Sequence, residues 1–350
     1  MAKNVLITGG AGFVGSHLAD ALLEAGHKVR VFDSLSPQVH PHGMPEYLNR
    51  AVEFMRGDMR DHAAVERAVS GVDVIFHEAA AVGVGQSMYE IESYVASNTQ
   101  GTAVLLQVLL DRKIPVEKLV VASSMSIYGE GSYRCGKCSE EAPELRKVEQ
   151  LKAKHWEVVC SRCGSDLNPI PTREEKPLQA PSFYALTKKD QEEMCLLFGR
   201  TYGLAVVALR YFNIYGTRQA LSNPYTGVAA IFASQLLNDR APMIFEDGGQ
   251  MRDFVSVHDV VQANLLAMEE SGADGRAVNI GSGSPVTISD VAGALNRSLG
   301  KSLASDVKGQ YRAGDIRHCF ADISVAKKLL GYKPRYAFQE GVLELAQWLR

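Results

Sequence analysis

Tyr184 and Lys188 stand four residues apart at the start of an apolar-periodic segment that follows a proline-rich loop. On a helix, positions i and i+4 share one face, so both side chains point into one cleft. This pair suits base catalysis by a phenol. A free tyrosine ionises near pH ~10, and acting near pH 7 requires a shift of roughly 4 kcal/mol. One ammonium about 4 Å away supplies on the order of 4 kcal/mol at moderate dielectric, so we expect Lys188 to lower the pKa of Tyr184. The simpler alternative is an exposed lysine beside a half-buried aromatic.

A glycine-rich turn lies between a short β-branched run, residues 4–8, and a helical pattern, residues 17–25. Its members are Gly9, Gly12, Phe13, Val14 and Gly15. Strand, glycine turn and helix in this order are the context of a dinucleotide-binding fingerprint. The glycines permit a tight turn, a close approach of the backbone to a pyrophosphate and close packing of helix on strand. The unpaired N–H groups of the helix then bind the phosphates. A tight loop without a ligand remains the alternative.

The second strand, residues 28–33, ends in an acid 18 residues beyond the last glycine of the turn. A carboxylate at this place, here Asp33, accepts hydrogen bonds from the ribose hydroxyls of the adenosine. It would also repel a 2′-phosphate, by about 4 kcal/mol at 4 Å. No arginine directly follows to compensate, so the sequence favours NAD over NADP. Asp58, with Met59 beside it, follows a third strand and is expected at the adenine edge.

Strands and helices continue to alternate through residues 52–56, 72–77 and 119–123. This rhythm predicts an α/β fold with a Rossmann-type, doubly wound parallel sheet. Ligands of such sheets bind beyond the carboxyl ends of the strands. We therefore expect the small residues Ala79 and Ala80, which follow the fourth strand, to lie against a cofactor.

The composition limits the partners. The chain has 350 residues, of which 46% are hydrophobic and 22% charged, and its formal net charge is -3. A chain of this length is expected to form two lobes. Without a basic field, a nucleic-acid partner is not expected. No apolar run approaches the ~20 residues that span a bilayer, and no signal-peptide pattern is seen, so we expect no membrane partner and a cytoplasmic location.

Four cysteines form two C-x-x-C pairs, Cys135 with Cys138 and Cys160 with Cys163, separated by 21 residues. This spacing is typical of a zinc ribbon, in which four thiolates complete a closed, structural site. Two disulfides are the alternative, and a cytosolic setting disfavours them. His155 is a possible substitute ligand. The segment that carries the cysteines has mixed charge, and we expect it to form a rigid flap or an oligomer contact near the mouth of the site.

Motifs along nearly the whole chain resemble those of the extended short-chain dehydrogenase/reductase enzymes that act on nucleotide sugars. The resemblance rests on the glycine turn, the run from Ser123 to Gly129 and the Tyr184–Lys188 pair, and on segments 98–102, 210–216, 252–259, 279–281 and 312–315. Residues 218–227 and the cysteine-bearing insertion are similar to the branch that epimerises dTDP-L-rhamnose at C4.

The resemblance implies roles for individual residues. Tyr184 is the base, Lys188 holds the nicotinamide ribose, and Ser124 hydrogen-bonds the sugar hydroxyl. The cofactor would be lined by Ser123, His77, Ala79, Asn98 and Tyr211. The substrate would contact Ser124, Ser126, Asn213, Arg218, Arg252, Arg312 and Cys319, because paired N–H groups of arginine grip phosphate oxygens. For Cys319, and likewise for Cys195, a buried structural role is the alternative.

One departure from the family pattern bears on the reaction. Dehydratases place an acidic pair after the catalytic Ser/Thr, whereas this chain has Met125 and Ser126 there. Hydride shuttling without water loss is therefore favoured, and the resemblance implies an NAD-dependent C4 epimerase of a nucleotide-diphosphate hexose. The alternatives are a 4-reductase, a decarboxylase or an NAD-binding sensor without turnover.

These observations predict two domains. Residues 1–212 would form the NAD-binding Rossmann domain, with the zinc-ribbon insertion at about 131–170. Residues 213–350 would form a smaller mixed α/β lobe that binds the nucleotide sugar. By resemblance, segments 104–110 and 188–202 would pair across a two-fold axis in a homodimer.

Overall fold

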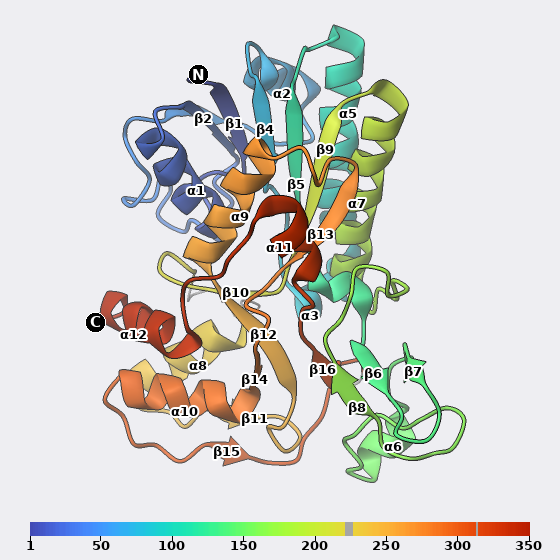
Figure 1. Cartoon of the computed structure of the whole chain (residues 1–350). Coiled ribbons are helices and arrows are strands. Elements are labelled where there is room, and N and C mark those ends of the chain that lie inside the picture. The colour runs from blue at the N-terminus through green and yellow to red at the C-terminus, as the bar shows by residue number, and fades with distance from the viewer. Residues whose placement is uncertain (221–226, 313) are drawn as a thin grey trace.

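The computed structural model describes residues 1–220, 227–312 and 314–350. Within these residues, seven parallel strands form one sheet in the order β13-β9-β5-β4-β1-β2-β3 (Figure 1). The strands are β1 (Asn4–Thr8), β2 (Lys28–Asp33), β3 (Glu53–Arg56), β4 (Val74–His77), β5 (Lys118–Ser124), β9 (Ala205–Tyr211) and β13 (Arg276–Ile280). The order reverses between β1 and β4, which is the switch point where open α/β sheets bind ligands.

Helices cover both faces of this sheet, because successive strand residues point to opposite sides. Val5 and Ile7 pack into one core and Leu6 into the other. The first face is covered by α1 (Phe13–Glu24), α9 (Val257–Glu269) and α11 (Ser324–Leu330). The second is covered by α2 (His62–Val69), α5 (Gly101–Arg112) and α7 (Phe183–Tyr202). Short helical segments follow β4 and β5, namely α3 (Val84–Ser87), α4 (Ile91–Tyr94), the π-helical η1 (Val95–Gln100) and the 3₁₀ turn η2 (Met125–Tyr128).

A smaller mixed lobe lies below the carboxyl edge of the sheet (Figure 1). Its central strand β12 (Met251–Ser256) pairs with β10 (Asn213–Tyr215), β14 (Pro285–Thr287) and β16 (His318–Cys319). Three helices share its core, α8 (Val228–Leu237), α10 (Ile288–Ser298) and α12 (Phe338–Trp348). A two-stranded ribbon, β11 (Met243–Ile244) with β15 (Asp306–Val307), borders it.

The chain does not divide cleanly at residue 213. β13 joins the large sheet beside β9, and α9 packs on α1, so parts of the segment 213–350 complete the Rossmann body. A strand of the large sheet is most stable when both faces are covered, and the later elements supply that cover.

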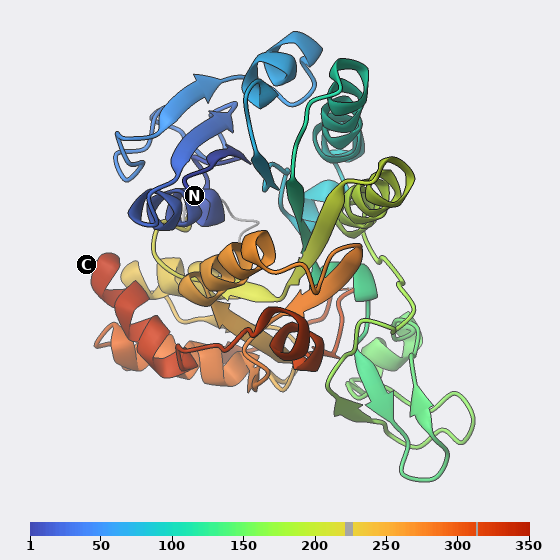
Figure 2. The same cartoon turned by 45° about the horizontal axis from the view of Figure 1, so that its top comes forward.

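The cysteine-bearing insertion projects from the body as a separate small unit (Figure 2). It contains an antiparallel sheet of β6 (Ser132–Arg134), β7 (Glu140–Glu141) and β8 (Asn168–Ile170), and one helical turn, α6 (Val148–Lys152). Its own apolar core is limited to Tyr133, Val158, Leu167 and two of the cysteines. The predicted class is confirmed: an α/β protein with a doubly wound parallel sheet, a smaller mixed lobe and a four-cysteine insertion.

Candidate active site

The Tyr184–Lys188 pair lies in the first turns of α7, as the spacing predicts. The helix starts at an extended Ser182, whose hydroxyl accepts a hydrogen bond from the N–H of Ala185 at 3.1 Å. Such a cap satisfies a donor that the helix itself cannot pair, and it fixes where the helix begins. Tyr184 therefore falls on the first turn and faces the carboxyl end of the sheet.

Ser124 reaches Tyr184 from the end of β5. The Ser124 side chain lies close enough to the Tyr184 phenol to oppose the rise of its pKa. The Ser124 oxygen also accepts hydrogen bonds from Ser126, from its hydroxyl at 2.9 Å and from its N–H at 3.2 Å. Ser124 and Tyr184, predicted as catalytic residues, and Ser126, predicted as a substrate contact, thus lie close together, and Met125 between the serines is buried in the core.

Lys188 is buried on the same face of α7 as Tyr184. The pKa values of the two residues differ from the expectation that Lys188 lowers the pKa of Tyr184. The Lys188 ammonium donates to Gln191 at 2.9 Å. Burial lowers the pKa of Lys188 to about 8, and the charge of Glu78 opposes this. The pKa of Tyr184 is raised rather than lowered, because burial outweighs the hydrogen bond with Ser124. Burial removes water from the phenolate and so disfavours the charged form of Tyr184, an effect that the Tyr–Lys spacing in the sequence does not reveal.

Glu78 is a site residue that the sequence argument missed. It follows β4, and its carboxylate accepts a hydrogen bond from the Tyr211 hydroxyl at 2.8 Å. Burial raises the pKa of Glu78 to about 7, while the Tyr211 hydrogen bond and the charge of Lys188 oppose the rise. Its position directly after a strand in a parallel sheet was the available signal.

The glycine turn forms a narrow cradle between β1 and α1. A Cβ atom on Gly9, which has φ +70, would lie 2.8 Å from the backbone of Ala79, and one on Gly15 would lie 2.6 Å from Gly10. At the start of α1, Gly12 brings no capping side chain, so the first N–H groups of the helix are open to an anion. Asp33 stands beside the turn, and its carboxylate accepts from the N–H groups of Ala11 and Leu35 at 3.1 and 2.9 Å. This arrangement fits a dinucleotide pyrophosphate and its adenosine ribose.

Four residues expected to line the cofactor form part of the walls of the site, where their side chains are buried and bonded to protein groups. His77 bonds Thr8 and Thr102 at 2.8 and 2.9 Å, and burial lowers its pKa to about 3. Asn98 bonds the backbone of Ala81. Ser123 bonds Glu192, and Tyr211 bonds Glu78 and Asn264.

Two further expected cofactor contacts also have protein partners. The Asp58 carboxylate accepts three hydrogen bonds from Arg60, and Met59 packs in the core that α2 and α5 share. Phe13 and Val14 are half-buried at the helix that follows the glycine turn, and Ala79 and Ala80 are half-buried after β4.

The expected substrate residues separate into groups. Arg252 on β12 and Arg312 belong to the smaller lobe, where Arg312 stacks on the Phe245 ring at 4.2 Å. Arg218 instead pairs with Asp20 of α1 at 2.7 Å, so it is held by the Rossmann body. The side-chain oxygen of Asn213 is buried without a hydrogen-bond partner among the described residues, which suits a ligand group. Most of the motif that follows Arg218, residues 221–226, lies outside the described residues.

Cys319 is a buried residue. It is 1% exposed on β16, it packs in the core, and burial raises the pKa of its thiol to about 12. Cys195 is likewise buried in the core, on α7. A small buried thiol behaves as an apolar residue, so burial favours the structural alternative for both cysteines.

The four cysteines of the insertion come together. The sulfur atoms of Cys135, Cys138, Cys160 and Cys163 all lie within 4.8 Å of one another. That spacing lets one ion contact all four, as in a closed tetrahedral thiolate site. His155 is no part of the cluster, since its ring pairs with Asp166 at 2.8 Å.

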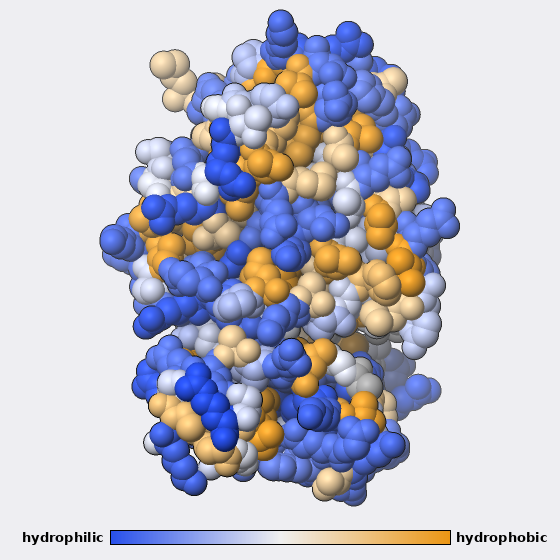
Figure 3. Space-filling view, turned by 90° about the vertical axis from the view of Figure 1, so that its right-hand side faces the viewer, coloured by the Kyte–Doolittle hydropathy of each residue, from blue (hydrophilic) through white to orange (hydrophobic). Residues whose placement is uncertain are grey.

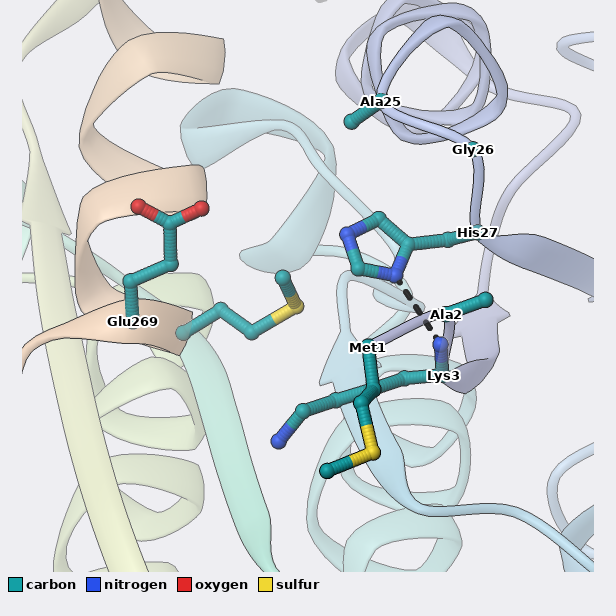
Figure 4. A pocket seen from close by; sticks show the side chains of 8 residues that line it. Met1, Ala2, Lys3, Ala25, Gly26, His27 and Glu269 are labelled. Atoms are coloured by element: carbon teal, nitrogen blue, oxygen red, sulfur yellow. Dashed lines mark hydrogen bonds between the residues drawn. The ribbon is translucent and has the colours of Figure 1, made fainter.

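Other surface features stand apart from this site. A shallow hollow lined by the N-terminal residues, His27 and Glu269 lies at the amino end of β1, the edge opposite the glycine turn (Figure 4). Among the described residues, none of the helices combines the length and the apolar character needed to cross a bilayer.

The fold and the site define a dinucleotide-binding oxidoreductase-type protein of the short-chain dehydrogenase/reductase class. The chain belongs to the NAD dependent epimerase/dehydratase family, whose model matches residues 5–281. It is 31% identical to the dTDP-L-rhamnose 4-epimerase of Burkholderia thailandensis, over 99% of this chain and 95% of that protein.

Solved structures agree with this assignment. The UDP-glucose 4-epimerase of Thermotoga maritima, in complex with UDP-glucose, has a TM-score of 0.82 at 33% identity, covering 99% of this chain and 98% of the other. The UDP-glucuronic acid 4-epimerase of Bacillus cereus, in complex with UDP-glucuronic acid and NAD, has a TM-score of 0.81 at 26% identity, with coverage of 99% and 98%.

Proposed function

We propose that this chain is an NAD-dependent epimerase that inverts C4 of a nucleotide-diphosphate hexose, with dTDP-L-rhamnose as the first candidate. The observation that carries the proposal is the approach of the Ser124 hydroxyl to the Tyr184 phenol, at the end of β5 and the start of α7, where it opposes the rise of the Tyr184 pKa. Lys188 lies one helical turn further along α7. Two hydroxyls and a buried cation are the groups that alcohol oxidation and ketone reduction at one carbon require.

Tyr184 and Ser124 have different roles in the proposed reaction. Tyr184 takes the proton of the 4-hydroxyl in the first half-reaction and returns it in the second. Ser124 holds the same oxygen and stabilises the developing carbonyl. NAD, when bound, would accept and return the hydride and would add positive charge near Tyr184. Burial raises the pKa of Tyr184, so Lys188 and the charge of the cofactor would have to act together to lower it.

The nucleotide end is bound by the smaller lobe. Arg252 and Arg312 are expected to hold the diphosphate while the 4-keto sugar turns about its glycosyl linkage. The open amides of α1 and the cradle at Gly9 support NAD as the cofactor. Asp33 supports NAD over NADP, because its charge would repel a 2′-phosphate.

Two accompanying features belong to the proposal. We infer that the four-cysteine cluster binds one structural zinc ion, because four thiolates leave no open position for catalysis. We also infer a homodimer through α5 and α7. Figure 3 shows apolar residues at the surface on the side of the molecule where α5 and α7 lie. The exposed apolar side chains of these two helices include Leu110, Leu186, Leu197 and Tyr202.

The test is incubation of the purified protein with dTDP-L-rhamnose and a panel of UDP-hexoses, without added reductant, followed by NMR of the recovered sugar. Inversion at C4 in one nucleotide sugar supports the proposal. A need for added NADH would instead indicate a reductase, and release of carbon dioxide from a uronic acid would indicate a decarboxylase. Bound NAD with no change in any sugar would refute enzymatic turnover on this panel.

A further inference from the structure

The segment from Asp315 to Cys319 lies between the cysteine-bearing insertion and Arg252. On one side its last two residues form β16, which pairs with β12 so that His318 faces Met251 and Cys319 faces Arg252. On the other side it is bonded to the stems of the insertion, where the N–H of Gly131 donates to the carbonyl of His318 at 2.8 Å. One strand therefore connects the insertion to the smaller lobe.

Buried charges strengthen this connection. Arg146, in the insertion, donates to both carboxylate oxygens of Glu246 at 2.8 and 2.9 Å, and to the carbonyl of Asp315 at 3.1 Å. The Arg146 and Glu246 side chains are 0% and 2% exposed. Bidentate pairs of this kind are strong and fix orientation, and a buried one is costly to break from one side.

Arg317 forms ion pairs with carboxylates of both the insertion and the smaller lobe. It donates to Glu157 of the insertion at 2.6 and 3.0 Å and to Asp247 of the smaller lobe at 2.7 and 3.0 Å. It also pairs with Glu246 at 3.0 Å. The pKa of Glu157 is lowered to about 2, because its hydrogen bonds to His318 and Arg317 outweigh burial.

The backbone of the same segment is held as well. Glu130, at the first stem of the insertion, accepts from the N–H of Arg317 at 2.7 Å and from the hydroxyl of Tyr133 at 2.8 Å. His318 accepts at Nδ1 from the N–H of Met251 and therefore donates through Nε2 to Glu157 at 3.0 Å. We call Glu130, Arg146, Glu157, Glu246, Arg317 and His318 the insertion network.

The insertion network contacts Arg252 through the backbone of residues 316 and 317. The Arg252 guanidinium donates to the carbonyls of Ile316 and Arg317 at 2.7 and 2.8 Å, and its backbone is paired through β16. The side chain that should hold the diphosphate is therefore oriented by the two peptide groups that the insertion fixes from the other side.

We propose that Arg146 and Glu157 are positioning residues for nucleotide-sugar binding, and that the cysteine-bearing insertion serves to hold the 315–319 strand and, through it, Arg252. This inference rests on the proposed function for the identity of the ligand. The insertion has a small apolar core, so its fold, and with it the placement of Arg146, depends on the four-cysteine site. Disturbing the network should weaken binding of the nucleotide and leave NAD binding intact, because the glycine turn lies on separate elements.

The experiment compares Arg146→Gln and Glu157→Gln with wild type in the NAD-loaded protein. Calorimetric titration with UDP and with dTDP gives Kd without requiring turnover. We expect both variants to bind the preferred nucleotide about tenfold more weakly, within the usual range of coupling between sites. The NAD content should stay unchanged. With a turned-over nucleotide sugar, KM should rise in the same proportion and kcat should change by less than about threefold.

Arg134→Gln is the matched control. Arg134 lies in the same insertion and pairs with Glu140, but this pair is exposed and outside the network, so nucleotide binding should stay within about twofold of wild type. If Arg146→Gln does not fold, Glu157→Gln decides, because its carboxylate is partly exposed and the change is milder. Trp156, whose carbonyl Arg146 binds at 2.9 Å, reports on the insertion by fluorescence in a Trp348→Phe background.

Unchanged Kd in both network variants overturns the inference and leaves the proposed function standing. A wild-type protein that binds UDP or dTDP but inverts no sugar refutes the proposed function, while the comparison of Kd values still decides the inference. Wild-type protein that binds neither nucleotide overturns both.

Discussion

The Ser123 hydroxyl donates a 2.6 Å hydrogen bond to the carboxylate of Glu192, and this bond ties the end of β5 to α7. Ser123 precedes Ser124, and Glu192 lies one helical turn beyond Lys188. The same carboxylate accepts a hydrogen bond from the guanidinium of Arg210, on β9, at 2.6 Å. The separation between Ser124 and Tyr184 is therefore set by a buried ion pair that spans two strands and a helix.

Replacing Glu192 by Ala should destabilise the protein by about 3–5 kcal/mol, because it leaves the buried charge of Arg210 without its carboxylate partner. The pair is 7% and 3% exposed. Urea unfolding of the variant would measure the loss. Glu193→Ala is the control on the same helix, since its pair with Lys189 is exposed and should cost less than about 1 kcal/mol. Equal losses in the two variants would contradict the role of the buried pair.

Replacing Tyr184 by Phe should lower turnover by about 10²–10⁴-fold, because the proton of the sugar hydroxyl then has no acceptor. The content of bound NAD should not change, since the glycine turn and Asp33 are untouched. Sugar inversion by NMR and the NAD content of the purified protein measure the two effects. Tyr202→Phe, an exposed position at the far end of α7, should retain wild-type turnover. Full activity in the Tyr184 variant would exclude the phenol as the base.

Glu78 predicts a pH-dependent stability. Burial raises its pKa to about 7 in the folded chain, from an ordinary value of 4.5. The folded state therefore holds this proton more tightly, and the contribution is full below about pH 4.5 and is lost as the pH rises through about 7. Over this window Glu78→Gln should remove on the order of 2 kcal/mol of the decline seen in wild type. Urea unfolding at pH 5 and pH 7.5 tests this, and parallel declines in both proteins would show that Glu78 titrates normally.

Removing one thiolate from the insertion should release the proposed zinc ion. Cys135→Ser should reduce zinc from one ion per chain to less than about 0.1 and expose the remaining cysteine thiols to a thiol reagent, because a closed site needs all four ligands. Metal analysis and thiol titration measure both changes. His155→Ala should keep its zinc, since this ring pairs with Asp166. Loss of metal in the His155 variant would instead make the histidine a ligand.

Replacing Leu197 by Glu should break the proposed homodimer. Leu197 is 57% exposed on α7, and a charge there would be buried without a partner in an apolar interface. Sedimentation velocity should show a shift from dimer to monomer. Leu343→Glu, on the outer face of α12 and 48% exposed, is the matched control and should stay dimeric. A Leu197 variant that remains a dimer would place the interface elsewhere.

The sequence by itself determined the sheet and the location of the site. Short apolar strands alternating with helices specify a doubly wound sheet. The glycine turn, Asp33, Ser124 and the Tyr184–Lys188 pair all fall at its carboxyl edge, because those signals are local. The pairing of the cysteines in one cluster was predicted from their spacing for the same reason.

Only the tertiary structure decided which of these side chains stay free and how they are charged. His77, Asn98, Ser123 and Tyr211 are used by buried hydrogen bonds to residues far away in the sequence, and Arg218 is held by Asp20. The direction of the pKa shift of Tyr184 depends on how much water burial removes from its hydroxyl. The ion pair of Arg146 with Glu246 joins residues that are 100 positions apart in the sequence. Such contacts, and the loss of water around buried groups, arise when distant segments pack together, and no local sequence pattern encodes them.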